Sequence, residues 1–229
     1  MNPRLRDAGI VLLAVAAIVG ASAAADARWL HWLAKPAATL LIASIVWQVQ
    51  PALSPRYRRG VLLGMALSCL GDIALMLPLD AFLPGLVAFL LAHLCYIAAF
   101  AGGARGGRAL LASVLLLGAV AAVNVIGLWP HLPVPMRLPV LVYVGALALM
   151  AALALARAMQ GHASPPGARW AAGGALLFVA SDALLAWDRF AGGLPQASLL
   201  VLATYYVAQY GIARSVAGAD QRNCRVSRK

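Results

Sequence analysis

The chain of 229 residues contains no glutamate, and charged side chains make up only 11% of it. A globular protein of this length would have too few charged groups to solvate its surface. Hydrophobic residues account for 63% of the chain. The shortage of charge and the excess of apolar residues exclude an ordinary soluble domain and predict an integral membrane protein.

Cysteine is also scarce, and Cys69, Cys95 and Cys224 lie far apart. Their spacing indicates neither a disulfide framework nor a metal site, and we expect no metal and no cofactor. The net charge is +11, but no segment combines a basic face with interleaved aromatic residues. A nucleic-acid partner is therefore not expected. The basic residues fall in short clusters between apolar runs, as in the loops of membrane proteins.

Eight apolar runs approach or reach the length of about 20 residues that a transmembrane helix needs. Proline and glycine residues separate these runs. The predicted spans are 8–25, 35–50, 60–78, 82–101, 109–129, 137–156, 170–188 and 195–214. A cleaved signal peptide is the alternative for the first run, which is too long and too poorly flanked for one. The sequence thus predicts an all-α, polytopic bundle of about eight transmembrane helices.

The basic residues assign this bundle an orientation. With the N-terminus inside, fourteen lysine and arginine residues fall on the cytoplasmic side, as the positive-inside rule requires. The four that fall outside are Arg28, Lys35, Arg137 and Arg189. We therefore predict a single domain over residues 1–229 in a bacterial cytoplasmic membrane. Both termini would be cytoplasmic, and residues 215–229 would form a basic tail.

Only two carboxylates, Asp72 and Asp182, lie well inside predicted spans. Each lies about 12 residues into a helix that runs outward, so both are about 18 Å from the cytoplasmic edge. An ionised carboxylate near the bilayer centre costs about 2.5–3.5 kcal/mol on insertion scales, so such residues face protein or water and are usually functional. A structural hydrogen bond to another helix is the alternative. Their common depth permits a pair but does not establish that they meet.

Asp72 ends a stripe of small residues at four-residue spacing, formed by Gly60, Gly64 and Ser68. Small residues at this spacing let a neighbouring helix approach closely. The stripe therefore predicts that Asp72 faces the interior of the bundle.

Other polar residues within the spans are candidates for substrate binding. His93 and Tyr96 are three residues apart and share a helix face, as do Tyr205 and Gln209 at four-residue spacing. The alternative for each is an interhelical hydrogen bond, and Tyr143 has the further alternative of an interfacial belt. The candidate set comprises Lys35, His93, Tyr96, Tyr143, Ser181, Tyr205, Tyr206 and Gln209.

Lys35 precedes Pro36 at the expected start of the second helix, where the helix dipole disfavours a cation. We expect a negative group to offset it: an aspartate, a lipid phosphate or a substrate phosphate. Snorkelling to the outer headgroups is the alternative.

Six short motifs follow one another along the chain. They are Lys35-Pro36, Gly71-Asp72-x-x-Leu75, His93-x-x-Tyr96, Tyr143 with Met150, Ser181-Asp182-x-x-Leu185-Ala186 and Tyr205-Tyr206-x-Ala208-Gln209. In this order they resemble the YhhN family of lysoplasmalogenases over roughly residues 35–209. The segments before and after carry no matching motif.

The resemblance implies a membrane hydrolase that cleaves the vinyl-ether bond of a lysoplasmalogen. The products would be a fatty aldehyde and a glycerophospho headgroup, and the family's two proposed catalytic aspartates correspond to Asp72 and Asp182. The expected partners are a lysophospholipid substrate and membrane lipid; the oligomeric state stays open.

The chemistry suits two carboxyl groups, because vinyl-ether hydrolysis needs a proton donor, a nearby anion and a base for water. Two carboxyls in a low-dielectric site can share one proton. Our hypothesis is that one aspartate donates the proton and the other stabilises the cation and activates water. A proton-coupled transporter of small solutes, using the same aspartates, is the alternative function. A metal-dependent lipid hydrolase with Asp72, Asp182 and His93 as ligands is a third possibility.

Overall fold

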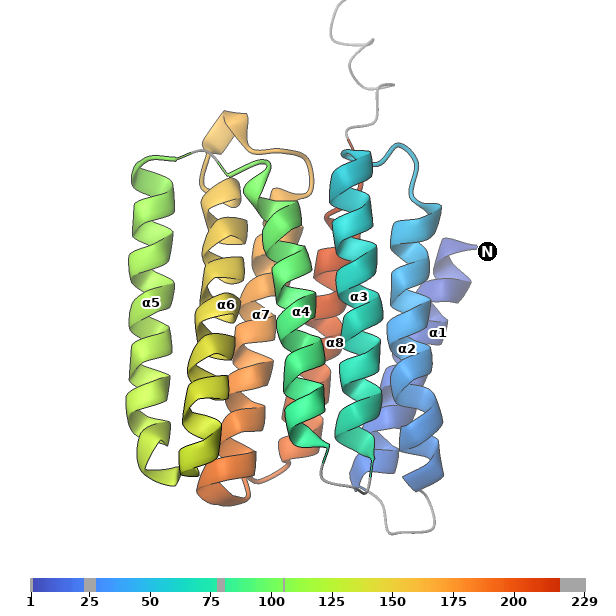
Figure 1. Ribbon diagram of the computed structural model, residues 1–229. Helices are drawn as coiled ribbons and strands as arrows, with labels where there is room; N and C mark the ends of the chain where they lie inside the picture. Colours follow the sequence, from blue (N-terminus) through green and yellow to red (C-terminus); the bar gives the residue numbers. More distant parts are fainter. Residues whose placement is uncertain (1, 23–27, 78–80, 105, 219–229) are drawn as a thin grey trace, which may run out of the picture.

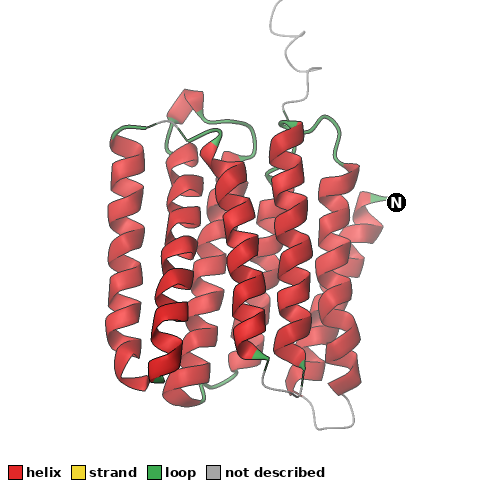
Figure 2. Cartoon of the chain, viewed as in Figure 1, coloured by secondary structure: helices red, strands yellow, loops and turns green. Residues whose placement is uncertain are grey.

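The computed structural model describes residues 2–22, 28–77, 81–104 and 106–218. In these residues the chain forms eight α-helices, and short 3-10 or π turns follow α5, α6 and α7. Figure 2 shows that the described residues are helix, turn or loop throughout. The helices are α1 (Pro3–Ser22), α2 (Arg28–Gln48), α3 (Pro55–Met76), α4 (Phe82–Ala101), α5 (Arg108–Leu128), α6 (Val134–Ala158), α7 (Ala168–Trp187) and α8 (Ala197–Arg214). The prediction of an all-helical bundle is confirmed.

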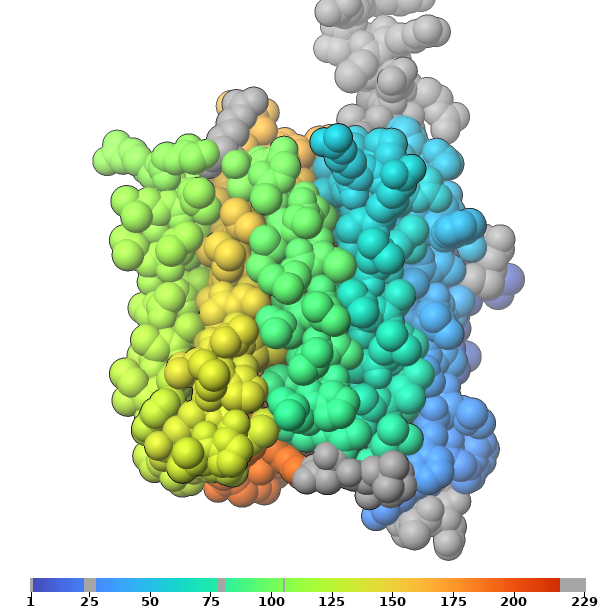
Figure 3. Space-filling view, viewed as in Figure 1, coloured from blue at the N-terminus to red at the C-terminus, as the bar shows by residue number. Residues whose placement is uncertain are grey.

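The helices run alternately up and down in two layers (Figure 1). One layer contains α5, α6, α4, α3 and α2 in that order, and α7, α8 and α1 lie behind it. Figure 3 shows that α3, α4 and α6 cover the middle of α7 and α8 on this face. Residues carried by α7 and α8 are therefore enclosed between the layers.

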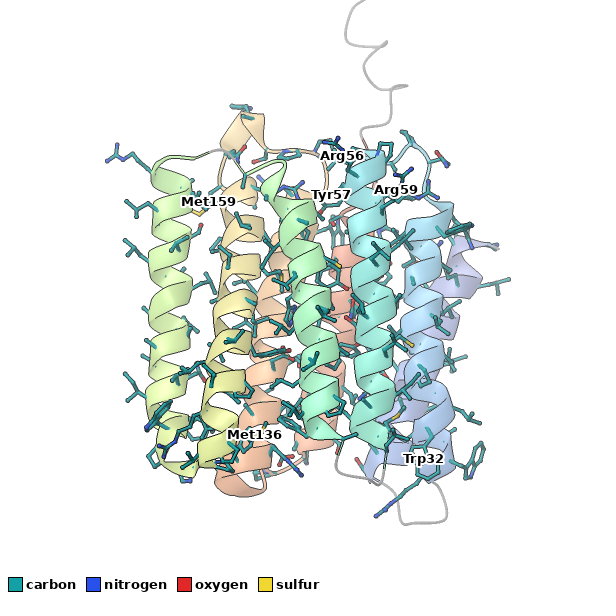
Figure 4. The ribbon with its side chains drawn as sticks, in the orientation of Figure 1. Trp32, Arg56, Tyr57, Arg59, Met136 and Met159 are labelled. Carbon is teal, nitrogen blue, oxygen red and sulfur yellow. The ribbon has the colours of Figure 1, made fainter. Side chains whose placement is uncertain are left out.

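The two ends of the bundle differ in composition. Arg56 and Arg59 lie at the end that also holds the α4–α5 and α6–α7 loops, whereas Trp32 and Met136 lie at the opposite end (Figure 4). By the positive-inside rule the arginine-rich end faces the cytoplasm. We call the opposite end the outer end.

The lateral surface between these ends is apolar. The large exposed side chains of the helices include Leu12, Leu63 and Ile126, and exposed tryptophans lie near the helix termini, for example Trp32 and Trp47. Tryptophan concentrates at the two membrane–water interfaces. The surface therefore matches a protein surrounded by lipid.

Helix α3 shows how local sequence sets a helix and its packing. Ser54 caps its N-terminus by accepting a hydrogen bond from the Tyr57 N–H at 3.1 Å, and Pro55 occupies the first turn, where a missing N–H costs nothing. Gly60 and Gly64 then face α4, where a Cβ would meet the Cys95 carbonyl or the Tyr96 ring. The small-residue stripe thus brings α3 and α4 together, as predicted.

Among the described residues, seven helices are long and apolar enough to cross a membrane, and α8 is outside that set. It is shorter and carries Thr204, Tyr205, Tyr206 and Gln209. Because α8 packs against α7, α1 and α2, Tyr205, Tyr206 and Gln209 are buried in protein, and Thr204 hydrogen-bonds to the Leu200 carbonyl of its own helix. Its length of about 27 Å still approaches that of the hydrocarbon core.

Four predicted starts were too late. Helices α1, α2, α3 and α6 begin at Pro3, Arg28, Pro55 and Val134 rather than at residues 8, 35, 60 and 137. Pro36 and Pro139 therefore lie inside helices rather than in their first turns. A proline removes one backbone hydrogen bond. Membrane helices tolerate this loss because neighbouring helices and side chains can satisfy the freed backbone group. The predicted positions 23–25 and 78 and most of the basic tail, 219–229, lie outside the described residues.

Candidate functional site

Asp72 on α3 is the centre of the first polar network. Its side chain is 1% exposed and forms an ion pair with Lys35 on α2, whose Nζ lies 3.2 Å from Oδ1. The other oxygen, Oδ2, accepts hydrogen bonds from the Thr39 hydroxyl at 3.0 Å and the Tyr205 hydroxyl at 2.6 Å. A buried carboxylate requires such compensation. The prediction that a negative group offsets Lys35 is confirmed, and that group is Asp72.

This network continues deeper into the bundle through α8 and α4. The Gln209 Nε2 donates to the Tyr205 hydroxyl at 3.2 Å, and the Tyr96 hydroxyl donates to Gln209 Oε1 at 3.0 Å. Tyr96 and Gln209 are fully buried. A chain of hydrogen bonds therefore holds the Tyr205 hydroxyl in the position from which it reaches Asp72.

Asp182 on α7 is the centre of the second polar network. The Tyr143 hydroxyl of α6 donates to its Oδ2 at 2.5 Å. His93 of α4 lies beside both groups, with Nε2 at 3.0 Å from the Tyr143 hydroxyl and 3.5 Å from Asp182 Oδ2. The Asp182 side chain is 12% exposed, whereas His93 is fully enclosed.

Aromatic rings lie between the two networks. The Phe178 ring contacts Tyr205 of the first network at 5.6 Å and His93 of the second at 4.9 Å, between ring centroids. Phe89 packs edge-on against Phe178 at 6.2 Å. Both carboxyls face the same interior, but no hydrogen bond or ion pair joins Asp72 to Asp182 in the described part of the chain.

Two cavities adjoin these networks. The first, which we call the mouth cavity, has a volume of about 670 Å³ and lies among the outer ends of α1–α4, α7 and α8. Its lining includes Arg28, His31, Lys35, Asp188 and Arg189. It therefore brings basic groups from α2 and from the turn after α7 to the outer side of the Asp72 network.

The second, which we call the apolar cavity, has a volume of about 90 Å³ and lies among α4, α5, α6 and α7. Its walls are mostly leucine, valine and phenylalanine, and Tyr143 and Asp182 supply polar groups. Leu75, Phe82 and Leu185 line both cavities. The two cavities are therefore neighbours, and an elongated molecule with one polar and one apolar end fits their arrangement.

Most of the residues predicted for the site belong to these networks. Two do not: the Ser181 hydroxyl donates to the Val201 carbonyl at 3.0 Å, which ties α7 to α8, and the buried Tyr206 hydroxyl has no hydrogen-bond partner within the described part of the chain. For Ser181 the geometry matches the alternative of an interhelical hydrogen bond.

Several contributors were missed at the sequence level. Thr39 lies four residues after Lys35, so helical spacing could have placed it on the same face. Phe89 and Phe178 carry no sequence signal, since phenylalanine is common in apolar spans. Arg28 and Arg189 were assigned to the outer side but not to a site.

The described residues contain no group of three or more histidine, cysteine or acidic side chains able to hold a metal ion. Asp72 bonds to Lys35, Thr39 and Tyr205, whereas Asp182 and His93 bond to Tyr143. The ligand set that a metal-dependent hydrolase would need is not assembled.

These features define a class: a polytopic helical membrane protein with a polar site between its helices, one buried and one part-buried carboxyl, and an apolar cavity beside a more polar one. The chain belongs to the YhhN family, which its sequence matches over residues 30–216. The resemblance inferred from the ordered motifs is thereby confirmed.

Curated relatives carry the name lysoplasmalogenase. The chain is 39% identical to human Lysoplasmalogenase TMEM86B over 187 residues, which are 82% of this chain and 75% of that protein. It is 43% identical to the pig protein of the same name over 65% of this chain and 59% of the relative. A Mycobacterium tuberculosis lysoplasmalogenase is 34% identical over 67% of this chain and 59% of the relative. No solved structure matches the chain.

Proposed function

We propose that this protein is a lysoplasmalogenase of the cytoplasmic membrane of a bacterium. It would hydrolyse the vinyl-ether bond of a lysoplasmalogen to a fatty aldehyde and glycerophosphoethanolamine or glycerophosphocholine. The observation that carries the proposal is Asp182, a carboxyl in the wall of an apolar cavity beside a basic cavity. The names of the relatives support the same reaction and give no support to a transporter.

The hydrolysis of a vinyl ether proceeds in three steps. A proton first adds to the β-carbon of the vinyl ether, which converts the double bond and ether oxygen into an oxocarbenium ion. Water then adds to the α-carbon and loses a proton, and the hemiacetal breaks its C–O bond to release aldehyde and the glycerol hydroxyl. One water is consumed, and the proton taken up in the first step is returned in the second.

We assign the first proton transfer to Asp182. The alkenyl chain is apolar and fits the apolar cavity, where Asp182 is the acidic residue in the lining. The Tyr143 hydroxyl holds the Asp182 carboxyl in place and links it to His93, a second titratable group. General acid catalysis requires such a donor within hydrogen-bonding reach of the carbon or of a single water.

Asp72 differs from Asp182 because a neighbouring cation balances its charge, and we assign Asp72 to the second step. Its charge is balanced by Lys35 and its oxygens accept hydrogen bonds from Thr39 and Tyr205, a set that stabilises a carboxylate. Asp72 lines neither cavity, so it would stabilise a nearby oxocarbenium ion through its charge and would accept the proton of the attacking water through a second water. Because the two carboxyls occupy separate networks, we propose successive roles rather than one shared proton.

The test is aldehyde release by the purified protein in a non-ionic detergent. A 1-alkenyl lysophospholipid is compared with its 1-acyl ester and its saturated 1-alkyl ether. The proposed mechanism predicts cleavage of the alkenyl compound alone, because the saturated ether has no β-carbon to protonate. Cleavage of the ester without cleavage of the vinyl ether would overturn the reaction assigned here.

A further inference from the structure

The two ring nitrogens of His93 have different surroundings. Nε2 lies 3.0 Å from the Tyr143 hydroxyl oxygen and 3.5 Å from Asp182 Oδ2. Nδ1 is buried and has no hydrogen-bond partner among the residues that the structure describes. A neutral imidazole carries one proton, and a buried N–H without an acceptor is costly. The proton therefore belongs on Nε2, the nitrogen that has oxygens beside it.

This placement sets the direction of the hydrogen bonds in the second network. The Tyr143 hydroxyl has a single hydrogen, and it cannot donate to a nitrogen that already carries a proton. The hydroxyl therefore accepts from His93 Nε2 at 3.0 Å and donates to Asp182 Oδ2 at 2.5 Å. The chain of hydrogen bonds runs one way, from His93 through Tyr143 to Asp182.

The two oxygens of Asp182 differ as a result. Oδ2 accepts the Tyr143 hydrogen, so a proton on Oδ2 would face another hydrogen. Oδ1 has no hydrogen bond or ion pair with the described residues, and yet it is not one of the fully enclosed polar atoms. It therefore keeps exposed surface, on a carboxyl that lines the apolar cavity. The acidic proton of Asp182 belongs on Oδ1.

We propose that His93 is a positioning residue for the first proton transfer. Through Tyr143 it keeps Oδ2 of Asp182 as an acceptor and leaves the acidic proton on Oδ1, toward the apolar cavity. This inference rests on the proposed function and names the residue that orients the acid. His93 is fully buried and lines neither cavity, so it acts through Tyr143 and not on the substrate.

The same chain stabilises the carboxylate that the first step produces. When the O–H bond at Oδ1 breaks, the π electrons of the vinyl ether form a C–H bond with its hydrogen, and the O–H electrons stay on the carboxyl group. The negative charge spreads over both oxygens, and the hydroxyl that donates to Oδ2 binds the charged form more strongly. His93 strengthens this donor, because hydrogen bonds in a chain polarise one another.

The kinetic experiment compares His93→Gln with His93→Phe in the full chain, purified in a non-ionic detergent, with a 1-alkenyl lysophospholipid as substrate. Glutamine keeps an N–H donor near the position of Nε2. Phenylalanine keeps a ring that can pack against Phe178, as His93 does, but it has no donor. The pair therefore separates the hydrogen bond from the packing.

We expect His93→Phe to lower kcat by up to about tenfold, the effect of one lost hydrogen bond. His93→Gln should lose less, and KM should change little in either variant. A role in packing alone predicts the opposite order, because phenylalanine fills an aromatic cluster better than glutamine. A kcat of His93→Phe that equals or exceeds that of His93→Gln would overturn the proposal.

A double variant tests whether His93 acts through Tyr143. In a Tyr143→Phe background the group that receives the His93 hydrogen bond is gone, so His93→Phe should cause no further loss of kcat. A clear further loss in the double variant would show that His93 acts independently of Tyr143, against the proposal.

The position of the imidazole proton can be measured without enzymatic activity. Glutamine replaces His31, His131 and His162, so that His93 is the single histidine, and the protein is purified without a histidine tag. NMR of isotopically labelled histidine then identifies Nε2 by its couplings to both carbon-bound ring hydrogens. We expect the proton on Nε2; a proton on Nδ1 would overturn the direction assigned to the chain.

The failure of the proposed function would look different. If the unaltered protein released no aldehyde, the reaction assignment itself would be wrong, and the NMR measurement would still decide where the proton lies. If aldehyde were released and the proton lay on Nδ1, the reaction would stand and the positioning role of His93 would fall.

Discussion

The two buried aspartates occupy closely similar positions in their helices but different surroundings. Asp72 is enclosed at 1% exposure and has an ion pair and two hydrogen-bond donors, whereas Asp182 is 12% exposed and opens onto an apolar cavity. Each follows a small residue, Gly71 or Ser181. The difference shows that the partners from other helices, and not the local sequence, separate a charge-balanced carboxylate from a carboxyl that faces a cavity.

The largest effect on activity is expected from Asp182→Asn. The amide keeps the shape and still accepts the Tyr143 hydrogen bond, but it cannot donate a proton to carbon. We expect kcat for aldehyde release to fall about 10²–10⁴-fold, the usual contribution of general acid catalysis, while the folded protein keeps its thermal stability. An Asp182→Asn protein with half of the original kcat would remove Asp182 from the first step.

Asp72→Asn should lower both activity and stability. It leaves the Lys35 ammonium buried beside a neutral group, and breaking a buried ion pair typically costs about 3–5 kcal/mol. Thermal unfolding in detergent, measured together with aldehyde release, checks both effects. The double variant Lys35→Met/Asp72→Asn removes the unpaired charge, so it should regain stability without regaining activity; recovery of activity would show that Asp72 has a structural role only.

A smaller effect is expected from Tyr143→Phe, which removes the hydroxyl that lies 2.5 Å from Asp182 and 3.0 Å from His93. Loss of one hydrogen bond costs about 0.5–1.5 kcal/mol, and we expect kcat to fall by up to about tenfold. The matched control is Tyr206→Phe, since that hydroxyl has no hydrogen-bond partner among the described residues. Equal kcat values for the two variants would contradict the role given to the second network.

The smallest effect on activity is expected from Gly64→Ala, at the inner end of the first network. A methyl group at this position would collide with the Tyr96 ring and shift Tyr96 away from Gln209. We expect a few-fold loss of kcat and a destabilisation of about 1–3 kcal/mol from overpacking. Gly145→Ala is the control, because no atom lies within 4 Å of its Cβ position. If both substitutions behaved alike, the hydrogen-bond chain behind Tyr205 would not matter for catalysis.

Much of the fold followed from the residues alone. Apolar runs and charge asymmetry predicted the helices, and the largest errors were at helix starts, because the first turns of α1, α2, α3 and α6 carry charged residues or proline that the apolar runs left out. Helix α8 shows the limit of hydropathy, because its Tyr205 and Gln209 make it too polar by composition although it packs within the bundle. Neighbouring helices supply the protein environment that these side chains need.

The sequence predicted most of the residues that form the two polar networks, but it did not predict how those residues are arranged. Asp72, Asp182, His93 and Tyr143 could be chosen because polar groups in a membrane are costly and are therefore informative. Their division into two networks could not be predicted, because the depth of a residue along its helix gives no information about its lateral position in the bundle. Thr39 was missed although its spacing from Lys35 was available.

By itself, the sequence determined that the chain is a helical membrane protein and which polar side chains lie within its helices, and it predicted which way the protein faces, because each of these depends on composition along one axis. Only the tertiary structure decided that Lys35 neutralises Asp72, that Tyr143 and His93 hold Asp182 at an apolar cavity, and that three outer cations line one mouth. Those pairings depend on how helices pack side by side. Packing arises from contacts between residues far apart in the chain, which no single segment encodes.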